Sequence, residues 1–178
     1  PLICQASVGG SIDPASFVDT DGARYVVWKN DGNSVSMESW LFIQRVSGDG
    51  LTLLSQPIKL INEDQYWEGR LVEAPDLIKH NGKYYLFYSA NSYADGRYAV
   101  GYAVADALQG PYAKPARPLL TTDIKSHIIG PGGEDVVMDG VANTWIVFHS
   151  WDKSVKYRSM NIAPLMWQNN VPVVALNP

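Results

Sequence analysis

Runs of apolar residues bounded by turn residues dominate the chain, and one such unit is repeated. Across residues 71–89, an acidic residue before a proline (LVEAP) precedes a short predicted strand (DLIKH), an Asn-Gly pair and a run of aromatic and aliphatic residues. Asn-Gly supplies the positive φ angles of a tight turn, so this unit is predicted to be a β-hairpin. The same order of features occurs in residues 12–28 and 130–148. The pattern therefore predicts three hairpin units.

The three units share one period. Tyr25, Tyr85 and Trp145 follow one another at intervals of 60 residues. A hairpin unit that recurs at a fixed period indicates a repeated array, and an all-β propeller is the best candidate. Each unit is expected to form a blade of four antiparallel strands, with approximate bounds 11–70, 71–129 and 130–178 in one partial domain covering residues 1–178. In the first unit the fourth strand is expected at residues 51–54, and no helix of useful length is predicted.

Three aromatic segments, 25–28, 84–88 and 145–148, are apolar at consecutive positions instead of alternating. Such segments are typical of strands covered on both faces, here by neighbouring sheets. The position just before each hairpin is then expected to face the common axis. Asp13, Glu73 and Gly133 occupy this position in the three units. Two carboxylates that are far apart in the sequence are thus predicted to converge at one pocket.

Composition and charge narrow the possible functions. The 178 residues are 46% hydrophobic and 18% charged, which is sufficient for a core and argues against disorder. The net charge is −4 and no basic run is present, so a nucleic-acid partner is not expected. No apolar stretch approaches the roughly 20 residues of a transmembrane helix, so no membrane partner is expected either.

Several short motifs, in order, give the chain a family resemblance. They are SIDP (11–14) with DTDG (19–22), VEAP (72–75) with GKYYL (82–86), GPG (130–132) and the closing segment 158–172. With these motifs the chain resembles glycoside hydrolase family 43, five-bladed propellers that cleave arabinose- and xylose-containing plant polysaccharides. The resemblance implies that about three of the five blades, the last three, are present.

The resemblance also implies roles for individual residues. Glu73 would be the general acid that protonates the leaving oxygen, and Asp13 would orient this acid and modulate its pKa. Arg158 would lie beside the second acid and contact the sugar. The family's general base belongs to an Asp-Pro segment of the first blade, which has no counterpart here, so an N-terminal segment or a second chain is expected to complete the propeller. Inversion of configuration is implied by the family alone.

Other residues leave alternatives open. Trp28 and Trp67 could stack on sugar rings, although inner-strand aromatic residues more often belong to a core; Trp67, on an apparent loop before Glu73, is the better candidate. His149 could line the axis or be a core imidazole bonded to the backbone. The family usually has a histidine near the axis where this chain has Gly133, so no cofactor and no metal, including a family-type calcium, is expected. His127 or Glu134 could substitute for that histidine, although a surface position is expected for each.

Two functions remain open at this point. The first is a glycosidase that hydrolyses oligo- or polysaccharides, and the second is a non-catalytic carbohydrate-binding propeller fragment that retained the acids for hydrogen bonding. Polysaccharide substrates suggest a secreted, extracellular protein.

Overall fold

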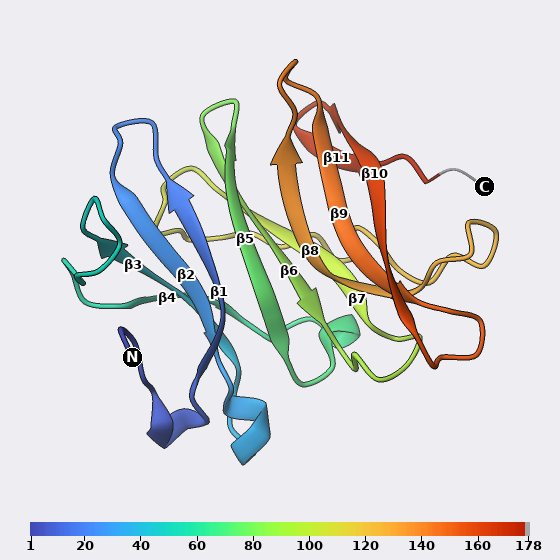
Figure 1. The fold of residues 1–178 in the computed structure, drawn as a ribbon, viewed down its shortest axis with the longest axis horizontal. Coiled ribbons are helices and arrows are strands. Elements are labelled where there is room, and N and C mark those ends of the chain that lie inside the picture. The colour runs from blue at the N-terminus through green and yellow to red at the C-terminus, as the bar shows by residue number, and fades with distance from the viewer. Residues whose placement is uncertain (177–178) are drawn as a thin grey trace.

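Three antiparallel sheets make up the computed structural model, which describes residues 1–176 (Figure 1). The first sheet contains β1 (Ser11–Val18), β2 (Arg24–Asn30), β3 (Trp40–Val46) and β4 (Ile58–Asn62), in that order. The second contains β5 (Val72–His80), β6 (Lys83–Ala90) and β7 (Ala99–Ala105). The third contains β8 (Ile129–Met138), β9 (Thr144–Trp151), β10 (Arg158–Gln168) and β11 (Val171–Val174). Three short 3₁₀ helices complete the described part: η1 (Ala6–Val8), η2 (Gly32–Val35) and η3 (Tyr66–Glu68).

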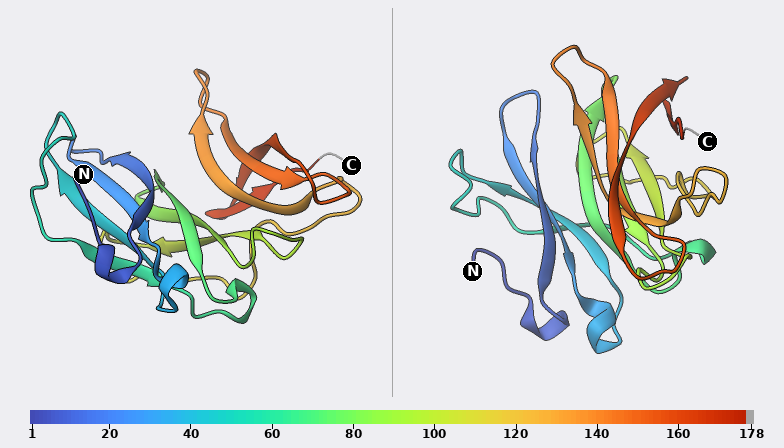
Figure 2. Two further views of the ribbon diagram at one scale, coloured as in Figure 1. Left: turned by 60° about the horizontal axis from the view of Figure 1, so that its bottom comes forward. Right: turned by 45° about the vertical axis from the view of Figure 1, so that its right-hand side comes forward.

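The second sheet lies between the other two, and the first strands of the three sheets are neighbours (Figure 2). Strand β5 contacts both β1 and β8, so these inner strands bring three distant parts of the sequence together. This is the predicted all-β arrangement of propeller blades, each a meander of antiparallel strands.

Two expectations about strands are wrong. In the described chain the second sheet has three strands, since the segment after β7 forms only isolated bridges, at Ala113 and Leu120. This segment, PYAKPARP, contains three prolines, which have no N–H to donate to a ladder. In the first sheet the fourth strand is β4 rather than residues 51–54, where Leu51 is exposed and Leu53 forms one bridge to Val46.

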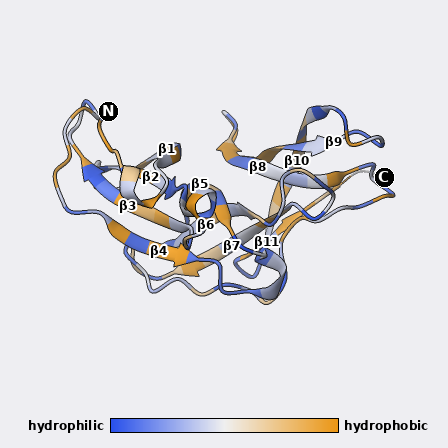
Figure 3. Ribbon diagram, turned by 90° about the horizontal axis from the view of Figure 1, so that it is seen from below, coloured by the Kyte–Doolittle hydropathy of each residue, from blue (hydrophilic) through white to orange (hydrophobic). Residues whose placement is uncertain are grey.

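Alternate residues of β6 enter two separate hydrophobic clusters. Leu86 and Tyr88 belong to the cluster between the first and second sheets, and Tyr85 and Phe87 to the cluster between the second and third. All four side chains are fully buried, because successive residues of a strand point to opposite faces. Figure 3, coloured by hydropathy, shows this middle sheet between the two outer ones. The predicted burial on both faces is confirmed for β6.

No helix in residues 1–176 is both long enough and apolar enough to cross a bilayer.

Candidate functional site

Each inner strand is interrupted at the same place in the repeat. The register shifts between Ile12 and Ala15 in β1, between Glu73 and Asp76 in β5, and between Gly132 and Asp135 in β8. Within these bulges φ is positive at Asp13 (52°), Ala74 (49°) and Gly133 (60°). Bulges re-aim side chains, and non-glycine residues with positive φ persist where the surroundings enforce them, often at functional sites. The bulges therefore direct the side chains at the axis.

Both carboxylate oxygens of Glu73 accept hydrogen bonds. Lys29 Nζ, from β2 of the first sheet, lies 2.9 Å from Oε2, and the Tyr98 hydroxyl donates to Oε1 at 2.7 Å. Lys29 is 1% exposed and also lies 3.3 Å from Asp31 Oδ1. Burial, together with the charge of Glu73, raises the pKa of Tyr98 far above its usual value, so the phenol remains a donor. The carboxyl group is thus held from two directions.

Asp13 lies beside Glu73, as predicted. Its Oδ2 accepts a hydrogen bond of 3.1 Å from the N–H of Ala74, the residue that follows Glu73. Burial raises the pKa of Asp13; the Ala74 N–H opposes this change and the nearby charge of Glu73 adds to it. An open depression of about 470 Å³ lies at this point, and its lining includes Asp13, Ala74, Asp76, Gly133 and Glu134. The bulges of all three sheets contribute to it.

Glu134 is buried, so the expectation of a surface position is wrong. The residue is 5% exposed, and its Oε2 accepts a hydrogen bond from Ser89 Oγ, which in turn accepts one of 2.8 Å from the Gly133 N–H. Its Oε1 is buried without a partner in the described structure. Burial raises the pKa of Glu134 well above its ordinary value, and the hydrogen bond from Ser89 opposes this change. In the sequence, its burial could have been expected only from its place next to Gly133, in the repeated position before the hairpin.

Asp76 is a second acid that the sequence analysis missed. It is 8% exposed, and its Oδ2 accepts a hydrogen bond of 2.8 Å from the Val136 N–H of the third sheet. Burial raises the pKa of Asp76 to about 6, against the effect of the Val136 N–H. Despite the several acids here, no group of three or more His, Cys, Asp or Glu residues among residues 1–176 is arranged to hold a metal ion.

The imidazole of His149 fills the space beside Gly133. A Cβ atom at Gly133 would lie 2.8 Å from His149 Cδ2, so a side chain at this position would displace the ring. The ring stacks on Tyr98 with centroids 5.8 Å apart, and Nε2 lies 3.5 Å from Arg158 Nη1. Burial and then the charge of Arg158 lower the pKa of His149, which makes the ring neutral near pH 7. His149 therefore packs against Gly133 and Tyr98, next to the bulge of β8.

Arg158 lies at the edge of this group. Its side chain is exposed, and its guanidinium lies 4.7 Å from the Trp151 ring and 5.4 Å from the Tyr93 ring. Contact with His149, which stacks on Tyr98, connects Arg158 to the surroundings of Glu73. The exposed Tyr93 ring was missed, since no repeat or motif marks it.

The two tryptophans proposed for sugar stacking lie elsewhere. Trp28 is 2% exposed, stacks on Phe42 and donates from Nε1 to Gln5 Oε1 at 2.8 Å, so it is a core residue and cannot present its ring to a sugar here. Trp67, on η3, is half-buried; its ring stacks on Tyr88 and covers the backbone at Gly101. Packing against the core, rather than an open platform, explains its position.

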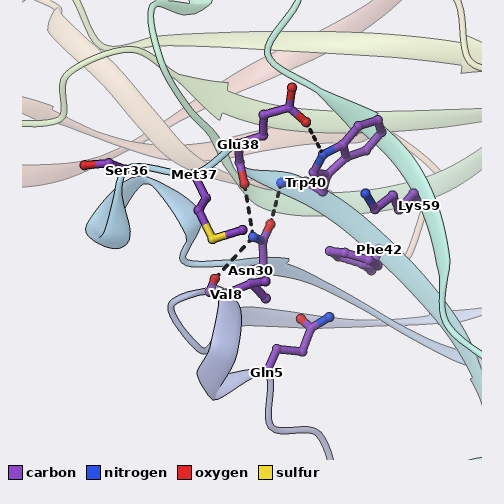
Figure 4. A pocket seen from close by; sticks show the side chains of 9 residues that line it. All are labelled: Gln5, Val8, Asn30, Ser36, Met37, Glu38, Trp40, Phe42 and Lys59. Atoms are coloured by element: carbon purple, nitrogen blue, oxygen red, sulfur yellow. Dashed lines mark hydrogen bonds between the residues drawn. The ribbon is translucent and has the colours of Figure 1, made fainter.

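Another hollow is separate from the acids. It measures about 550 Å³ and is lined by Gln5, Val8, Asn30, Ser36, Met37, Glu38, Trp40, Phe42 and Lys59 (Figure 4). Asn30 organises it, donating to the carbonyls of Val8 and Glu38 and accepting from the Trp40 N–H. Neither Asp13 nor Glu73 lines this hollow. This hollow therefore lacks the pair of acids on which the proposal of a hydrolytic site rests.

Comparisons with known proteins agree with the fold and the motifs. Residues 2–172 match the family described as "Glycosyl hydrolases family 43". A putative beta-xylosidase of Xylanibacter ruminicola is 26% identical over 177 residues, which cover 99% of this chain and 31% of that protein. An extracellular exo-alpha-(1->5)-L-arabinofuranosidase of Streptomyces chartreusis is 30% identical over 150 residues, covering 79% of this chain and 44% of that protein.

A solved structure is also similar to this chain. The crystal structure of a thermostable family-43 glycoside hydrolase superposes with a TM-score of 0.82 at 32% identity, over 94% of this chain and 59% of that one. The chain therefore spans less than two thirds of the proteins it matches, a partial domain with the propeller fold. On these matches, the chain belongs to glycoside hydrolase family 43.

Proposed function

We propose that this chain carries the general acid, and the carboxylate next to it, of a glycosidase site that hydrolyses arabinose- or xylose-containing polysaccharides. The observation that supports this most is the meeting of Asp13 and Glu73, from bulges of two different sheets, through the hydrogen bond between Asp13 Oδ2 and the Ala74 N–H. A pair of acids is the usual equipment for glycoside cleavage. The xylosidase and arabinofuranosidase named among the relatives support the pentose substrate class.

In the proposed mechanism, Glu73 gives its proton to the oxygen that leaves the sugar, while Asp13 fixes the backbone next to it and supplies a neighbouring negative charge. Tyr98 and Lys29 hold the carboxyl group in place. Arg158, with its guanidinium beside two aromatic rings, would contact the sugar at the edge of the site. General acid catalysis of this kind contributes about 10²–10⁴-fold to a rate.

The attacking water needs a base on the opposite side of the sugar. In an inverting glycosidase this carboxylate stands about 6.5–9.5 Å from the acid. We propose that a further segment or chain supplies it and completes the propeller. Supporting this, the face of the third sheet turned away from the core exposes Met160 (80%) and Ile162 (63%), and apolar patches of this kind mark interfaces. A relative named extracellular supports secretion as part of the proposal.

The test is hydrolysis of aryl arabinofuranosides and aryl xylosides by the protein expressed from its complete coding sequence. Glu73→Gln is expected to lower kcat/KM by about 10²–10⁴-fold on substrates with poor leaving groups. Glu38→Gln, which changes an exposed carboxylate outside the axial site, is the matched control and should retain the parent rate. Equal rates for the parent and Glu73→Gln on a substrate with a poor leaving group would remove Glu73 from the mechanism.

The same variant separates catalysis from binding. Both oxygens of Glu73 already accept hydrogen bonds, which also suits a site that only binds sugars. In that case the parent would bind arabino- or xylo-oligosaccharides without hydrolysing them, and intact-mass measurement of the protein from its source would show no additional segment or chain.

A further inference from the structure

One position in the repeat links each sheet to the next. Lys29, Ser89 and His149 follow at intervals of 60 residues, each on the second strand of its sheet. Each pairs with an inner-strand residue at the start of a bulge: Lys29 with Ile12, Ser89 with Glu73 and His149 with Gly132. The position is therefore equivalent in space as well as in sequence.

The first two members of this series bind a carboxylate of the following sheet. Lys29 Nζ, in the first sheet, lies 2.9 Å from Glu73 Oε2 in the second. Ser89 Oγ, in the second sheet, donates to Glu134 Oε2 in the third. The contact between Lys29 and Glu73 thus has a counterpart between the second and third sheets, although Glu134 lies one repeat position after Gly133, the equivalent of Glu73.

The cost of burying Lys29 argues for a specific role. A buried ammonium is destabilising by several kcal/mol unless it is well paired. Lys29 is 1% exposed, and its charge is offset by Glu73 at 2.9 Å and, at a longer distance, Asp31 at 3.3 Å. A packed apolar side chain would join the sheets without that cost, so the charge at this position requires an explanation.

We propose that Lys29 is a positioning residue that decides which oxygen of Glu73 carries the acidic proton. This inference rests on the proposed function of Glu73. An ammonium group can donate but not accept, so the Oε2 lone pair that faces Lys29 must remain unprotonated. The Tyr98 hydroxyl on Oε1 can both donate and accept, so it tolerates either state of that oxygen. Because the ammonium charge lies nearer Oε2, it holds the negative charge of the carboxyl group on that oxygen, and the proton is consequently favoured on Oε1.

The proton balance is simple. Glu73 carries the proton on the Oε1 lone pair that faces the leaving oxygen, while the Tyr98 hydroxyl contacts the other lone pair of Oε1. As the glycosidic C–O bond breaks, its electron pair goes to the leaving oxygen, and the proton moves from Oε1 to that oxygen. Glu73 is left as a carboxylate, with Lys29 donating to Oε2 and Tyr98 donating to Oε1, which is the arrangement seen in this structure.

The test compares leaving groups. A dinitrophenyl glycoside needs little protonation as its bond breaks, whereas an alkyl glycoside or a disaccharide depends on it. In the protein expressed from its complete coding sequence, Lys29→Met is expected to lower kcat/KM by about 10²-fold on the alkyl glycoside, since a misplaced catalytic group costs about that much. On the dinitrophenyl glycoside the change should stay within about threefold of the parent. Lys83→Met, which removes an exposed lysine paired with Asp106, is the control.

A second variant covers the case in which the methionine variant does not fold. Lys29→Arg keeps the charge and the donors but moves them, so it should show the same selective loss at a smaller size. Equal slowing of both substrates, or no loss on the alkyl glycoside in a folded variant, would overturn the role of Lys29. Glu73→Gln separates the two proposals: if it shows the selective loss and the Lys29 variants do not, the function of Glu73 stands and the role of Lys29 falls.

Discussion

The N–H of Ala74 donates a hydrogen bond of 3.1 Å to Asp13 Oδ2, across the boundary between the first and second sheets. Both residues have positive φ and both lie in a bulge of an inner strand. The bond therefore joins the two bulges, and it stabilises the positive φ of both residues. It also places the carboxyl group of Asp13 against the backbone that carries Glu73, so the geometry of one acid depends on the other.

Asp13→Asn should lower activity more than stability. The amide oxygen can still accept from the Ala74 N–H, so the sheet contact survives, while the negative charge beside Glu73 is lost. Loss of a neighbouring charge that tunes an acid is expected to reduce kcat/KM by about 10–10²-fold on substrates with poor leaving groups. Urea unfolding of the same variant should differ from the parent by less than about 1 kcal/mol. A large loss of stability with unchanged activity would show a purely structural role.

Tyr98→Phe should weaken the hold on Glu73 without removing the aromatic stack on His149. The lost bond runs from a phenol to a carboxyl group, and bonds to charged groups contribute about 1.5–3 kcal/mol. The variant is expected to bind substrate nearly as well as the parent but to show a lower kcat. Steady-state kinetics on the aryl and alkyl glycosides give both values. A raised KM with kcat unchanged would place Tyr98 in substrate binding instead.

Asp76 gives the protein a pH-dependent stability with a defined direction. The pKa of Asp76 in the folded state is raised to about 6 from 3.8, so the folded protein binds the proton more tightly than the unfolded chain. This stabilisation is complete below pH 4 and is lost as the pH rises through about 6. A pKa that differs by about 2 between the folded and unfolded states corresponds to roughly 3 kcal/mol of stability.

Urea unfolding at pH 4 and pH 7 measures that effect. Asp76→Asn keeps an acceptor for the Val136 N–H but cannot ionise, so its stability should fall less between these values than that of the parent. Asp106→Asn, at an exposed position, should follow the parent curve. Parallel curves for the parent and Asp76→Asn would contradict the burial argument.

The repeat in the sequence predicted much of this arrangement, and its limits have physical reasons. The 60-residue period was enough to predict three units, the burial of β6 on both faces and the approach of Asp13 to Glu73. It did not predict the bulges, because the extra residues of a bulge interrupt the alternation from which strands are recognised. Glu134 lies within the register shift of β8 and is buried there, whereas it was expected at the surface.

The residues that hydrogen-bond to Glu73 could not be predicted from the sequence either. Lys29 and Tyr98 contact Glu73 from other strands, and a single charged or aromatic residue in an apolar run gives no indication of its partner. The fourth strand of the second sheet was predicted from the period alone. It does not form, because the prolines at 111, 115 and 118 have no N–H to donate to a neighbouring strand. Local composition should therefore be weighed separately in each repeat.

Gly133→Ala tests how tightly His149 packs against position 133, and so whether the imidazole ring is the reason that this position holds a glycine. The backbone has φ of 60°, which costs an alanine about 1–2 kcal/mol, and the new Cβ would lie 2.8 Å from His149 Cδ2. The single substitution should lower the free energy of unfolding by about 1–3 kcal/mol. In a His149→Ala background the clash is gone, and the cost should fall to the backbone contribution of about 1 kcal/mol. In a double-mutant cycle measured in urea, the double variant is therefore expected to lose less stability than the sum of the two single losses. Additive effects would show that the imidazole does not occupy the space beside Gly133 in solution.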